Sequence, residues 1–325
     1  MILYIGRSAD PTLNLAIEEC FLREYKEDVF MLWQNDNTIV VGKNQNTLAE
    51  IDLDYVKTNG IRVVRRNTGG GAVYHDMGNL NFTYITSCEG EWESDFSRFA
   101  TPVISALAKL GIKAEVSGRN DIVVDGRKFS GNAQTVIGGR LLHHGTILFN
   151  TDVSVLSKAL TPDPEKIQSK GVKSVSSRVV NLSELLPDGI DAKRLTTLLS
   201  DEVKEMYGAS EYELSGEELK RAEKLADEKY RTWEWNFGYS PKYTFNKKKR
   251  FEGGTVNAFL TVVEGKITDA KIFGDFFGVG EVSEIEAALC GKNHNETAIK
   301  EALSEFEIGN YFGKISEDNL LEVLI

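Results

Sequence analysis

The sequence predicts an α+β protein with a large N-terminal domain and a small C-terminal α+β domain. Strand-like and helix-like runs follow one another without the regular βαβ alternation that a doubly wound parallel sheet requires. The composition also shifts to proline, lysine and glycine around residues 240–254, as is typical of a domain boundary. We therefore expect the large domain at residues 1–243, the small domain at 244–325 and a linker at about 240–252.

The first half of the large domain shows helix and strand signals in turn. A helix is expected after Asp10-Pro11, because an N-cap carboxylate followed by proline starts a helix and Leu13, Ile17 and Phe21 share one helical face. A second helix is expected from about 94 to 110. Short apolar runs between polar and glycine turns predict strands at 30–35, 38–42, 60–66 and 81–86.

Later elements carry equally local signals. Asp125-Gly126 predicts a two-residue hairpin turn, so Lys128 belongs to the start of the returning strand. Ser215 and Glu218 form a capping box that opens a helix ending near Tyr230. In the small domain we expect two strands around the turn at 264–266, followed by amphipathic helices at 281–290 and 296–306.

Composition and charge exclude several classes of protein. The net charge of −11 over 325 residues argues against a nucleic-acid binder, and the basic run Lys247 to Arg250 is short enough to be a solvated linker. No window reaches about 18 apolar residues and no signal-peptide pattern opens the chain, so we expect a cytoplasmic protein without a membrane span. Three cysteines without CxxC spacing predict neither disulfides nor a zinc site.

The segment RRNTGGGAVYHDMGN at residues 65–79 is the strongest functional signal. Three successive glycines allow backbone N–H groups to approach an anion, although a tight hairpin between strands 62–66 and 81–85 needs glycine as well. Arg65, Arg66 and His75 add polar groups that a structural turn does not need, which favours an anionic small ligand. Neither standard phosphate-loop pattern is present.

Three further segments carry polar groups beside predicted strands. Residues 118–134 offer Asn120, Asp121 and Lys128, with Asp121 a candidate oxygen ligand for Mg²⁺. His143 and His144 are adjacent on a strand and point to opposite faces, so together they cannot readily chelate one metal. Residues 169–182 form a predicted lysine- and serine-containing loop that is able to close over phosphate.

Taken in order, RRNTGGGAVYHDMGNLN, GRNDI, DGRKFSGNA, HHGTILFN and KGVKSVSSRVVNLSELLP closely resemble the motifs of the lipoate-protein ligase A family. The resemblance covers residues 1–243, and the remainder resembles the accessory domain of the long, two-domain ligases. It implies a catalytic fold related to biotin protein ligases. It also implies an enzyme that activates lipoate with ATP to lipoyl-adenylate and then transfers the lipoyl group to a lysine of a lipoyl domain.

The resemblance also assigns roles to residues. Lys128 matches the lysine that contacts both substrates, and we expect it to act electrostatically during catalysis. Residues 69–77 match the lipoate-binding loop and residues 170–180 the adenylate-binding loop. Asp121 is the candidate Mg²⁺ ligand. The predicted ATP or adenylate site comprises Arg66, Gly71, Ala72, Val73, Tyr74, Asn120, Asp121, Lys128, Ser174 and Arg178. The predicted lipoate site comprises Gly69, Gly70, Gly71, His75, Lys128, His144 and Gly145.

Substrates and partners follow from the same resemblance. ATP with Mg²⁺ and lipoate are expected, without a tightly bound prosthetic group. The expected acceptors are lipoyl-domain proteins, namely E2 subunits of 2-oxoacid dehydrogenases and the glycine cleavage H protein, and we expect a monomer that binds neither nucleic acid nor membrane. The base that deprotonates the acceptor lysine stays open among His75, His144, Asp121 and the AMP phosphate.

Two other functions compete with the ligase. An octanoyl or lipoyl transferase would carry the acyl group on a cysteine, for which Cys88 after the strand at 81–86 is the candidate. A noncatalytic binder of lipoyl domains, or a lipoate sensor, would need no catalytic lysine. A biotin ligase is disfavoured, because RRNTGGG stands where its arginine-rich biotin loop is expected.

Overall fold

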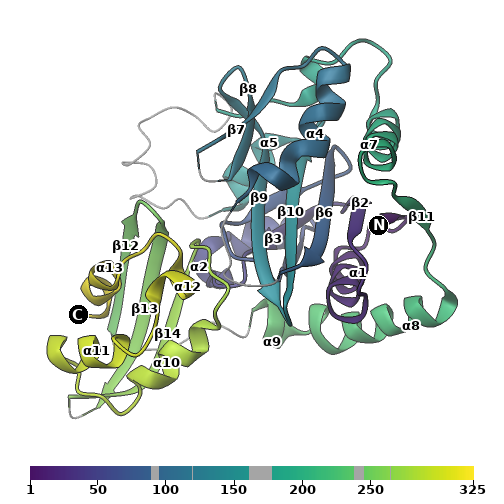
Figure 1. Ribbon diagram of the computed structural model, residues 1–325. Coiled ribbons are helices and arrows are strands. Elements are labelled where there is room, and N and C mark those ends of the chain that lie inside the picture. The colour runs from purple at the N-terminus through teal and green to yellow at the C-terminus, as the bar shows by residue number, and fades with distance from the viewer. Residues whose placement is uncertain (89–94, 119, 161–177, 238–244, 264) are drawn as a thin grey trace.

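The structure is a computed structural model that describes residues 1–88, 95–118, 120–160, 178–237, 245–263 and 265–325. An eight-stranded mixed sheet forms the centre of the large domain (Figure 1). β1 is parallel to β2 and to β11, and the other neighbours are antiparallel. The spatial order is β11 (Ser210–Tyr212), β1 (Ile2–Ile5), β2 (Val29–Trp33), β6 (Asn79–Ser87), β10 (Arg140–Leu148), β9 (Arg127–Ile137), β8 (Asp121–Val124) and β7 (Ala114–Ser117).

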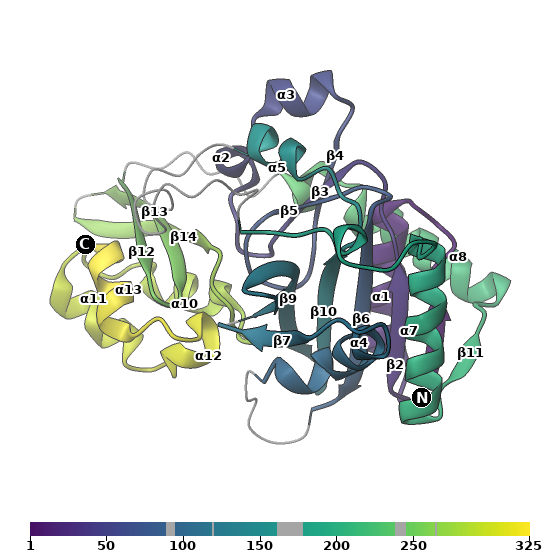
Figure 2. The same cartoon turned by 90° about the horizontal axis from the view of Figure 1, so that it is seen from above.

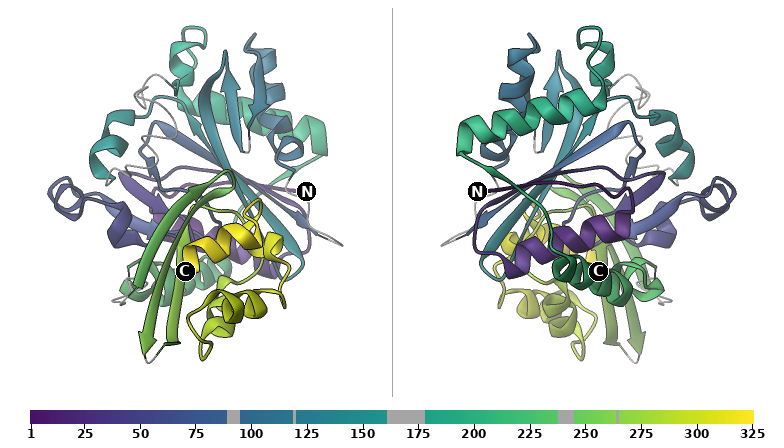
Figure 3. Two further views of the ribbon diagram at one scale, coloured as in Figure 1. Left: turned by 90° about the vertical axis from the view of Figure 1, so that its left-hand side faces the viewer. Right: turned by 90° about the vertical axis from the view of Figure 1, so that its right-hand side faces the viewer.

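Helices cover both faces of this sheet (Figure 3). Helices α4 (Ser97–Lys109) and α7 (Ala192–Tyr207) lie on one face, and α1 (Pro11–Glu24) and α8 (Gly216–Leu225) on the other. The uninterrupted apolar strand β2 fits between them, because alternate side chains point to opposite faces. Phe30 accordingly enters the core under α4 and α7, while Met31 enters the core under α1.

A second, three-stranded sheet holds the glycine-rich segment. β3 (Thr38–Val41) pairs in parallel with β4 (Arg62–Arg65) and antiparallel with β5 (Val73–His75). Residues 66–72 therefore link β4 to β5, and the alternative of a hairpin between strands 62–66 and 81–85 is wrong. Nearby lie the short helices α2 (Thr47–Glu50), α3 (Leu53–Thr58) and α5 (Val153–Ala159), and the 3₁₀ turn η2 (Leu182–Glu184).

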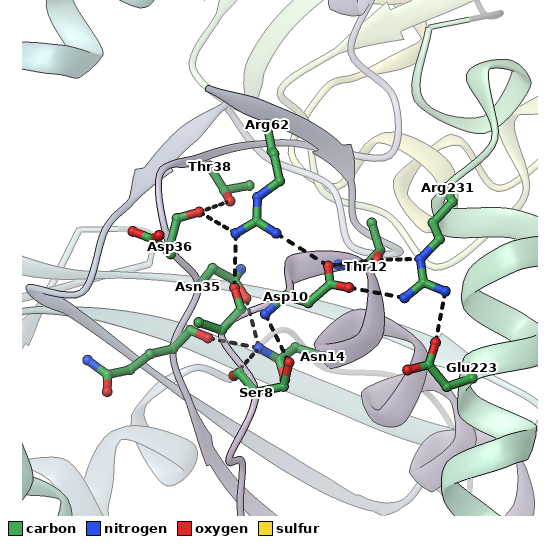
Figure 4. Close-up of polar contacts among 12 residues, drawn as sticks. Ser8, Asp10, Thr12, Asn14, Asn35, Asp36, Thr38, Arg62, Glu223 and Arg231 are labelled. Carbon is green, nitrogen blue, oxygen red and sulfur yellow. Dashed lines mark hydrogen bonds and ion pairs between the residues drawn. The ribbon is translucent and has the colours of Figure 1, made fainter. Parts of the chain in front are cut away.

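The predicted start of α1 is confirmed. The carboxylate of Asp10 accepts the Thr12 backbone N–H at 3.0 Å, and Pro11 occupies the first turn. The other Asp10 oxygen pairs with Arg231 at 3.0 Å, while Arg62 lies at 3.6 Å (Figure 4). One carboxylate thus caps the helix and connects it to strand β4 and to the segment after α8.

The local turn signals are confirmed as well. Asp125 and Gly126 adopt φ values of 50° and 73°, as a two-residue hairpin between β8 and β9 requires. Ser215 and Glu218 form the capping box of α8, which continues into the π-helical turn η3 (Ala226–Tyr230). The short helix α9 (Trp233–Asn236) follows and packs beside β4.

The small domain is a three-stranded antiparallel sheet with helices packed on it (Figure 2). Val256, Ala258 and Leu260 alternate along β13 and join the core formed with the helices. Lys247 to Arg250 lie in strand β12, so their interpretation as a solvated linker is wrong. Because residues 238–244 are outside the described ranges, the domain boundary stays a prediction. The elements are β12 (Phe245–Phe251), β13 (Gly254–Val263), β14 (Lys266–Gly274), α10 (Val282–Leu289), α11 (Glu296–Leu303), α12 (Ile308–Phe312) and α13 (Glu317–Leu324).

The small domain contacts the large domain beside the glycine-rich segment. Lys43 pairs with Glu281 at 2.8 Å, and the backbone N–H of Gly274 donates to the Asn44 carbonyl. The ring of Phe277 lies edge-on to Phe96, with centroids 5.9 Å apart. Among the described helices of both domains, none is long and apolar enough to cross a bilayer.

Candidate active site

A cavity of about 380 Å³ opens between the two sheets of the large domain and the small domain. Most of the predicted site residues line it: Arg66, Gly70, Gly71, Ala72, Val73, His75, Asn120, Asp121, Lys128, His144 and Gly145. Gly69 and Tyr74 are not among its lining residues, and Ser174 lies outside the described residues. The Tyr74 hydroxyl donates instead to the Asn37 side chain at 3.1 Å.

The Arg66 side chain holds the glycine-rich loop by hydrogen bonds to its carbonyl groups. Its Nη2 donates to the carbonyls of Gly69 and Gly71 at 2.7 and 2.9 Å, and its Nη1 donates to the Val40 carbonyl at 3.0 Å. In a trans peptide the N–H points away from the C=O, so the N–H groups of Gly70 and Ala72 point away from the guanidinium. Because both residues line the cavity, the loop is able to present N–H donors to an anion there.

Arg66 is almost fully buried yet charged. Burial lowers the pKa of Arg66 to about 10, with Glu18 opposing the shift and Arg65 adding to it. The guanidinium therefore stays protonated at neutral pH and gives the loop a fixed positive charge beneath its amides. Its part in binding nucleotide stays a prediction.

Arg65 has a different task from its neighbour. Its side chain is 1% exposed, and all three guanidinium nitrogens donate to protein oxygens. The acceptors are the carbonyls of Gly42, Lys43, Gln45, Trp235 and Asn236 and the hydroxyl of Thr47, at 2.6 to 3.3 Å. Arg65 thus fastens strand β4 to α9 and to the segment after β3, and the expectation that it supplies positive charge to the ligand is wrong.

A buried carboxylate anchors the start of the loop. Glu19 accepts hydrogen bonds from Lys229, Tyr230 and Asn67 at 2.7, 2.6 and 3.1 Å. Burial alone would raise its pKa, but the Lys229 charge and these hydrogen bonds outweigh burial and lower the pKa of Glu19 to about 2. The ionised carboxylate holds Asn67 between α1 and η3 at neutral pH.

The three glycines serve different purposes. A Cβ atom at Gly69 would lie 2.4 Å from the Phe276 carbonyl oxygen, so the bare backbone there accommodates the small domain. Gly70 has a φ of 95°, which disfavours any side chain, and the ring of Phe277 packs against it. A Cβ at Gly71 would meet no atom within 4 Å, so only Gly71 faces open space.

These surroundings predict opposite outcomes for two alanine substitutions. Gly69→Ala is expected to disturb the seating of the small domain, because the Phe276 backbone must move away. Gly71→Ala is expected to keep the wild-type melting temperature but to weaken ATP and lipoate binding, because the added methyl group enters the cavity. Thermal melts and ligand titrations of both variants test this, and equal behaviour of the two would contradict it.

Lys128 reaches the cavity from the second residue of β9. Its Nζ lies 2.7 Å from an oxygen of Asp121 on the adjacent strand β8, and both side chains are 37% exposed. Its backbone bonds to the far end of the predicted adenylate-binding loop: Lys128 N–H donates to the Arg178 carbonyl at 2.8 Å, and Val180 N–H donates to the Lys128 carbonyl at 2.9 Å. Arg178 therefore meets Lys128 through its backbone, as far as the described residues reach.

Asn120 also lines the cavity, but its side chain and backbone are hydrogen-bonded to strand β9. Its side-chain amide nitrogen donates to the Asn132 backbone carbonyl at 2.6 Å, and its backbone carbonyl accepts the Asn132 backbone N–H at 2.9 Å. These bonds fix Asn120 against β9, directly before Asp121 at the start of β8. Nucleotide contact by Asn120 stays a prediction.

The two adjacent histidines point to opposite faces, as expected. His143 is buried in the core, stacked on Phe99 with ring centroids 4.9 Å apart and bonded to Gln134 at 3.0 Å. Burial lowers the pKa of His143 well below its ordinary value, so it is neutral. His144 turns to the other side and lines the cavity.

His75 is a buried, neutral side chain in the cavity wall. Burial, with a smaller contribution from the charge of Arg66, lowers the pKa of His75 to about 3. Asn35 contacts its Nδ1 at 3.1 Å, and Asn35 in turn accepts from Asn14 in the network of Figure 4. Its buried Nε2 atom has no hydrogen-bond partner among the described residues.

Sequence reasoning missed several lining residues and their supports. Arg250, Asp275 and Phe277 reach the cavity from the small domain, and no local pattern announces that contact. Asn14 and Glu18 are fully buried on α1, and here a signal exists: polar residues four apart that flank the apolar run Leu15-Ala16-Ile17. Within the described ranges, no cluster of three or more acidic, histidine or cysteine side chains forms a preassembled metal site.

The cavity brings together the cation Lys128, the glycine-rich loop that Arg66 holds and residues of the small domain, an arrangement suited to anionic small ligands. The lipoyl protein ligase A/B catalytic domain family matches residues 10–204, and the bacterial lipoate protein ligase C-terminus family matches residues 240–324. The chain therefore belongs to the lipoate-protein ligase family, and the predicted combination of catalytic and accessory domains is confirmed.

Individual proteins are similar over most or all of the chain. Lipoate-protein ligase LplJ of Bacillus subtilis is 44% identical over 320 residues, 97% of both chains. Plasmodium falciparum LipL1 in complex with lipoate superposes with a TM-score of 0.80 at 28% identity, covering 99% of this chain and 97% of that one. A bipartite ligase from Thermoplasma acidophilum, described with its E2 lipoyl domain, has a TM-score of 0.66 at 30% identity over 75% of this chain and 98% of its own. An ATP-bound lipoate-protein ligase A has a TM-score of 0.61 at 28% identity over 73% of this chain and 98% of its own.

Proposed function

We propose that this protein is an ATP-dependent lipoate-protein ligase that works in two steps. A lipoate carboxylate oxygen attacks the α-phosphorus of ATP, and the bond to pyrophosphate breaks, giving lipoyl-adenylate. The neutral amine of an acceptor lysine then attacks the lipoyl carbonyl carbon, AMP leaves, and an amide forms with loss of a proton. Family membership, a relative bound to lipoate and another bound to ATP support this reaction.

The observation that carries the proposal is the placement of Lys128 at the cavity that the glycine-rich loop also lines. The first step brings two anions together, and their repulsion opposes the reaction. An ammonium group at Lys128, held by Asp121 at 2.7 Å, offsets that charge without reorganising during the reaction. The backbone N–H groups of Gly70 and Ala72, which also line the cavity, add fixed dipoles that favour negative charge.

The residues present fit the usual way in which proteins bind Mg²⁺ beside a nucleotide. Such ions are held by one or two carboxylates together with substrate phosphates and water. Asp121 supplies one carboxylate in the cavity wall, and its second oxygen is separate from the one nearest Lys128. We therefore propose Asp121 as the protein ligand of a Mg²⁺ that neutralises phosphate charge.

For the second step, we propose that the acceptors are lipoyl domains, including those of 2-oxoacid dehydrogenase E2 subunits and the glycine cleavage H protein. The bipartite relative described with its E2 lipoyl domain supports this choice. Of the candidate bases, His75 is the least suited, because a group with a pKa of about 3 is a poor proton acceptor for lysine. His144, Asp121 and the AMP phosphate stay as candidates. The cytoplasmic location and the monomeric state stay predictions of the sequence.

The cysteine-based transferase is poorly supported by geometry. The cavity-lining residue His144 pairs with Thr83 of β6, and Cys88 lies five residues beyond Thr83, about 16 Å away in extended conformation. Cys20 lies under α8, where burial, with help from Glu24 and Glu19, raises the pKa of its thiol to about 12. Neither thiol is placed to act as a nucleophile on a ligand in this cavity.

A pyrophosphate-release assay with lipoate, ATP and Mg²⁺ tests the proposed reaction. We expect pyrophosphate to form only when lipoate is present, and Cys88→Ala to keep the wild-type rate because Cys88 is remote from the cavity. Acyl transfer from a carrier protein that needs no ATP and is lost in Cys88→Ala would establish the transferase instead.

A further inference from the structure

We infer that Glu18 is a positioning residue for the glycine-rich loop, acting through His144 and Thr68 on Arg66. The inference rests on the proposed function only for its expected effect on the reaction rate. The chain of contacts itself is continuous in the structure and joins helix α1 to the loop. Of these four residues, Arg66 and His144 line the cavity and Glu18 and Thr68 do not. Glu18 and Thr68 therefore act on a ligand only through their neighbours.

The contacts form one unbroken series. Glu18 Oε1 lies 2.9 Å from His144 Nδ1, and His144 Nε2 lies 2.7 Å from Thr68 Oγ1. Thr68 Oγ1 then accepts Arg66 Nε–H at 2.9 Å. Glu18 and Thr68 are fully buried and His144 is 8% exposed, so water does not compete for these bonds.

Donor-only groups at both ends, together with the acceptor available to each hydroxyl proton, assign a direction to each hydrogen bond. The Trp33 indole N–H donates to Thr83 Oγ1 at 2.9 Å, so the Thr83 proton goes to Glu18 Oε1 at 2.7 Å. At the other end the Arg66 guanidinium donates to Thr68, and His144 Nε2 is the acceptor that the described residues offer for the Thr68 proton. His144 therefore carries its proton on Nδ1, facing Glu18.

The consequence for the loop follows from what Arg66 holds. The same guanidinium whose Nε is fixed by Thr68 binds the Gly69 and Gly71 carbonyls through Nη2. Fixing Nε sets the plane of the guanidinium, and with it the direction of the loop carbonyls and of the N–H groups opposite them. Without Thr68, the guanidinium keeps its bonds to Val40, Gly69 and Gly71 but loses the one at Nε, so its plane and the loop amides are held less firmly.

Two substitutions at Thr68 separate the hydroxyl from the shape of the side chain. Thr68→Val keeps the volume and removes the bond to both neighbours, whereas Thr68→Ser keeps the hydroxyl. We expect Thr68→Val to lower kcat/KM for pyrophosphate release about 10- to 100-fold and Thr68→Ser to restore most of it. Thr151→Val is the matched control, because the buried Thr151 hydroxyl has no partner among the described residues.

Glu18 is tested by the protonation of His144, which a merely structural role would not move. In protein labelled with ¹⁵N-histidine, and with His144→Gln to assign the signals, we expect a protonated Nδ1 and an unprotonated Nε2 in the wild type. Glu18→Gln retains an acceptor oxygen and should keep this tautomer. Glu18→Met removes the acceptor and should abolish the preference, with a loss of rate like that of Thr68→Val.

The combined variant Glu18→Met with Thr68→Val should be no slower than the slower single variant, because both break one chain. A wild-type rate in Thr68→Val, additive losses, or a proton on Nε2 of wild-type His144 would overturn the inference. The tautomer is measured without turnover. If the wild type releases no lipoate-dependent pyrophosphate, the proposed function fails while the spectrum still decides whether the relay exists.

Discussion

Replacing Lys128 with alanine is expected to lower the rate of lipoyl-adenylate formation about 10²- to 10³-fold, the usual cost of one preorganised electrostatic contact in a transition state. The ammonium group is the cation that Asp121 holds at the cavity wall, and no second lysine lines that cavity among the described residues. Lipoate-dependent pyrophosphate release under saturating ATP and Mg²⁺ measures the effect.

Arg127→Ala is the matched control for Lys128→Ala. Arg127 is the preceding residue on β9, and it points to Glu184 at 3.9 Å rather than into the cavity. Both side chains are substantially exposed, so both variants should melt near the wild-type temperature. Adenylate formation by Lys128→Ala at the wild-type rate would show that its assigned role is wrong.

The second large effect is expected on stability. Arg65→Leu should lower the free energy of unfolding by at least about 3 kcal/mol, because it leaves several buried carbonyl oxygens without a donor, each costing about 1 to 3 kcal/mol. Urea unfolding measures it. Arg62→Leu, on the same strand, is the control, since Arg62 is 44% exposed and its ion pair with Asp10 is long.

The outcome also separates the two adjacent arginines. If Arg65→Leu is as stable as the wild type but no longer binds ATP, Arg65 contacts the ligand and its structural assignment fails. A destabilised protein that still binds ATP at low temperature would agree with the role derived from its contacts.

The parts of the fold that sequence predicted correctly depend on neighbouring residues. The turn at Asp125-Gly126 and the cap at Asp10 are fixed by local backbone preferences, which a sequence displays directly. Lys128 and Gly71, which sequence motifs singled out, both line the cavity. The turn and cap signals and the motifs are all patterns of residues that are close together in the sequence.

What the sequence could not reveal depends on partners far along the chain. Arg65 and Arg66 are chemically identical neighbours. Arg65 donates hydrogen bonds to residues near 42–47 and 235–236, whereas Arg66 donates to carbonyls of the glycine-rich loop. Likewise, Gly69 is bare because the Phe276 backbone, about 200 residues later, packs on it. A glycine in a sequence does not say which neighbour requires its lack of a side chain.

Two of the contacts between the domains are made by main-chain atoms of the small domain. The Gly274 N–H meets the Asn44 carbonyl, and the Phe276 carbonyl lies on Gly69. Contacts of this kind survive the drift of side chains over evolutionary time and leave no pair of positions that must change together. Methods that infer proximity from correlated substitutions should therefore detect these two contacts poorly, and should find the domain interface mainly through side-chain pairs such as Lys43 and Glu281.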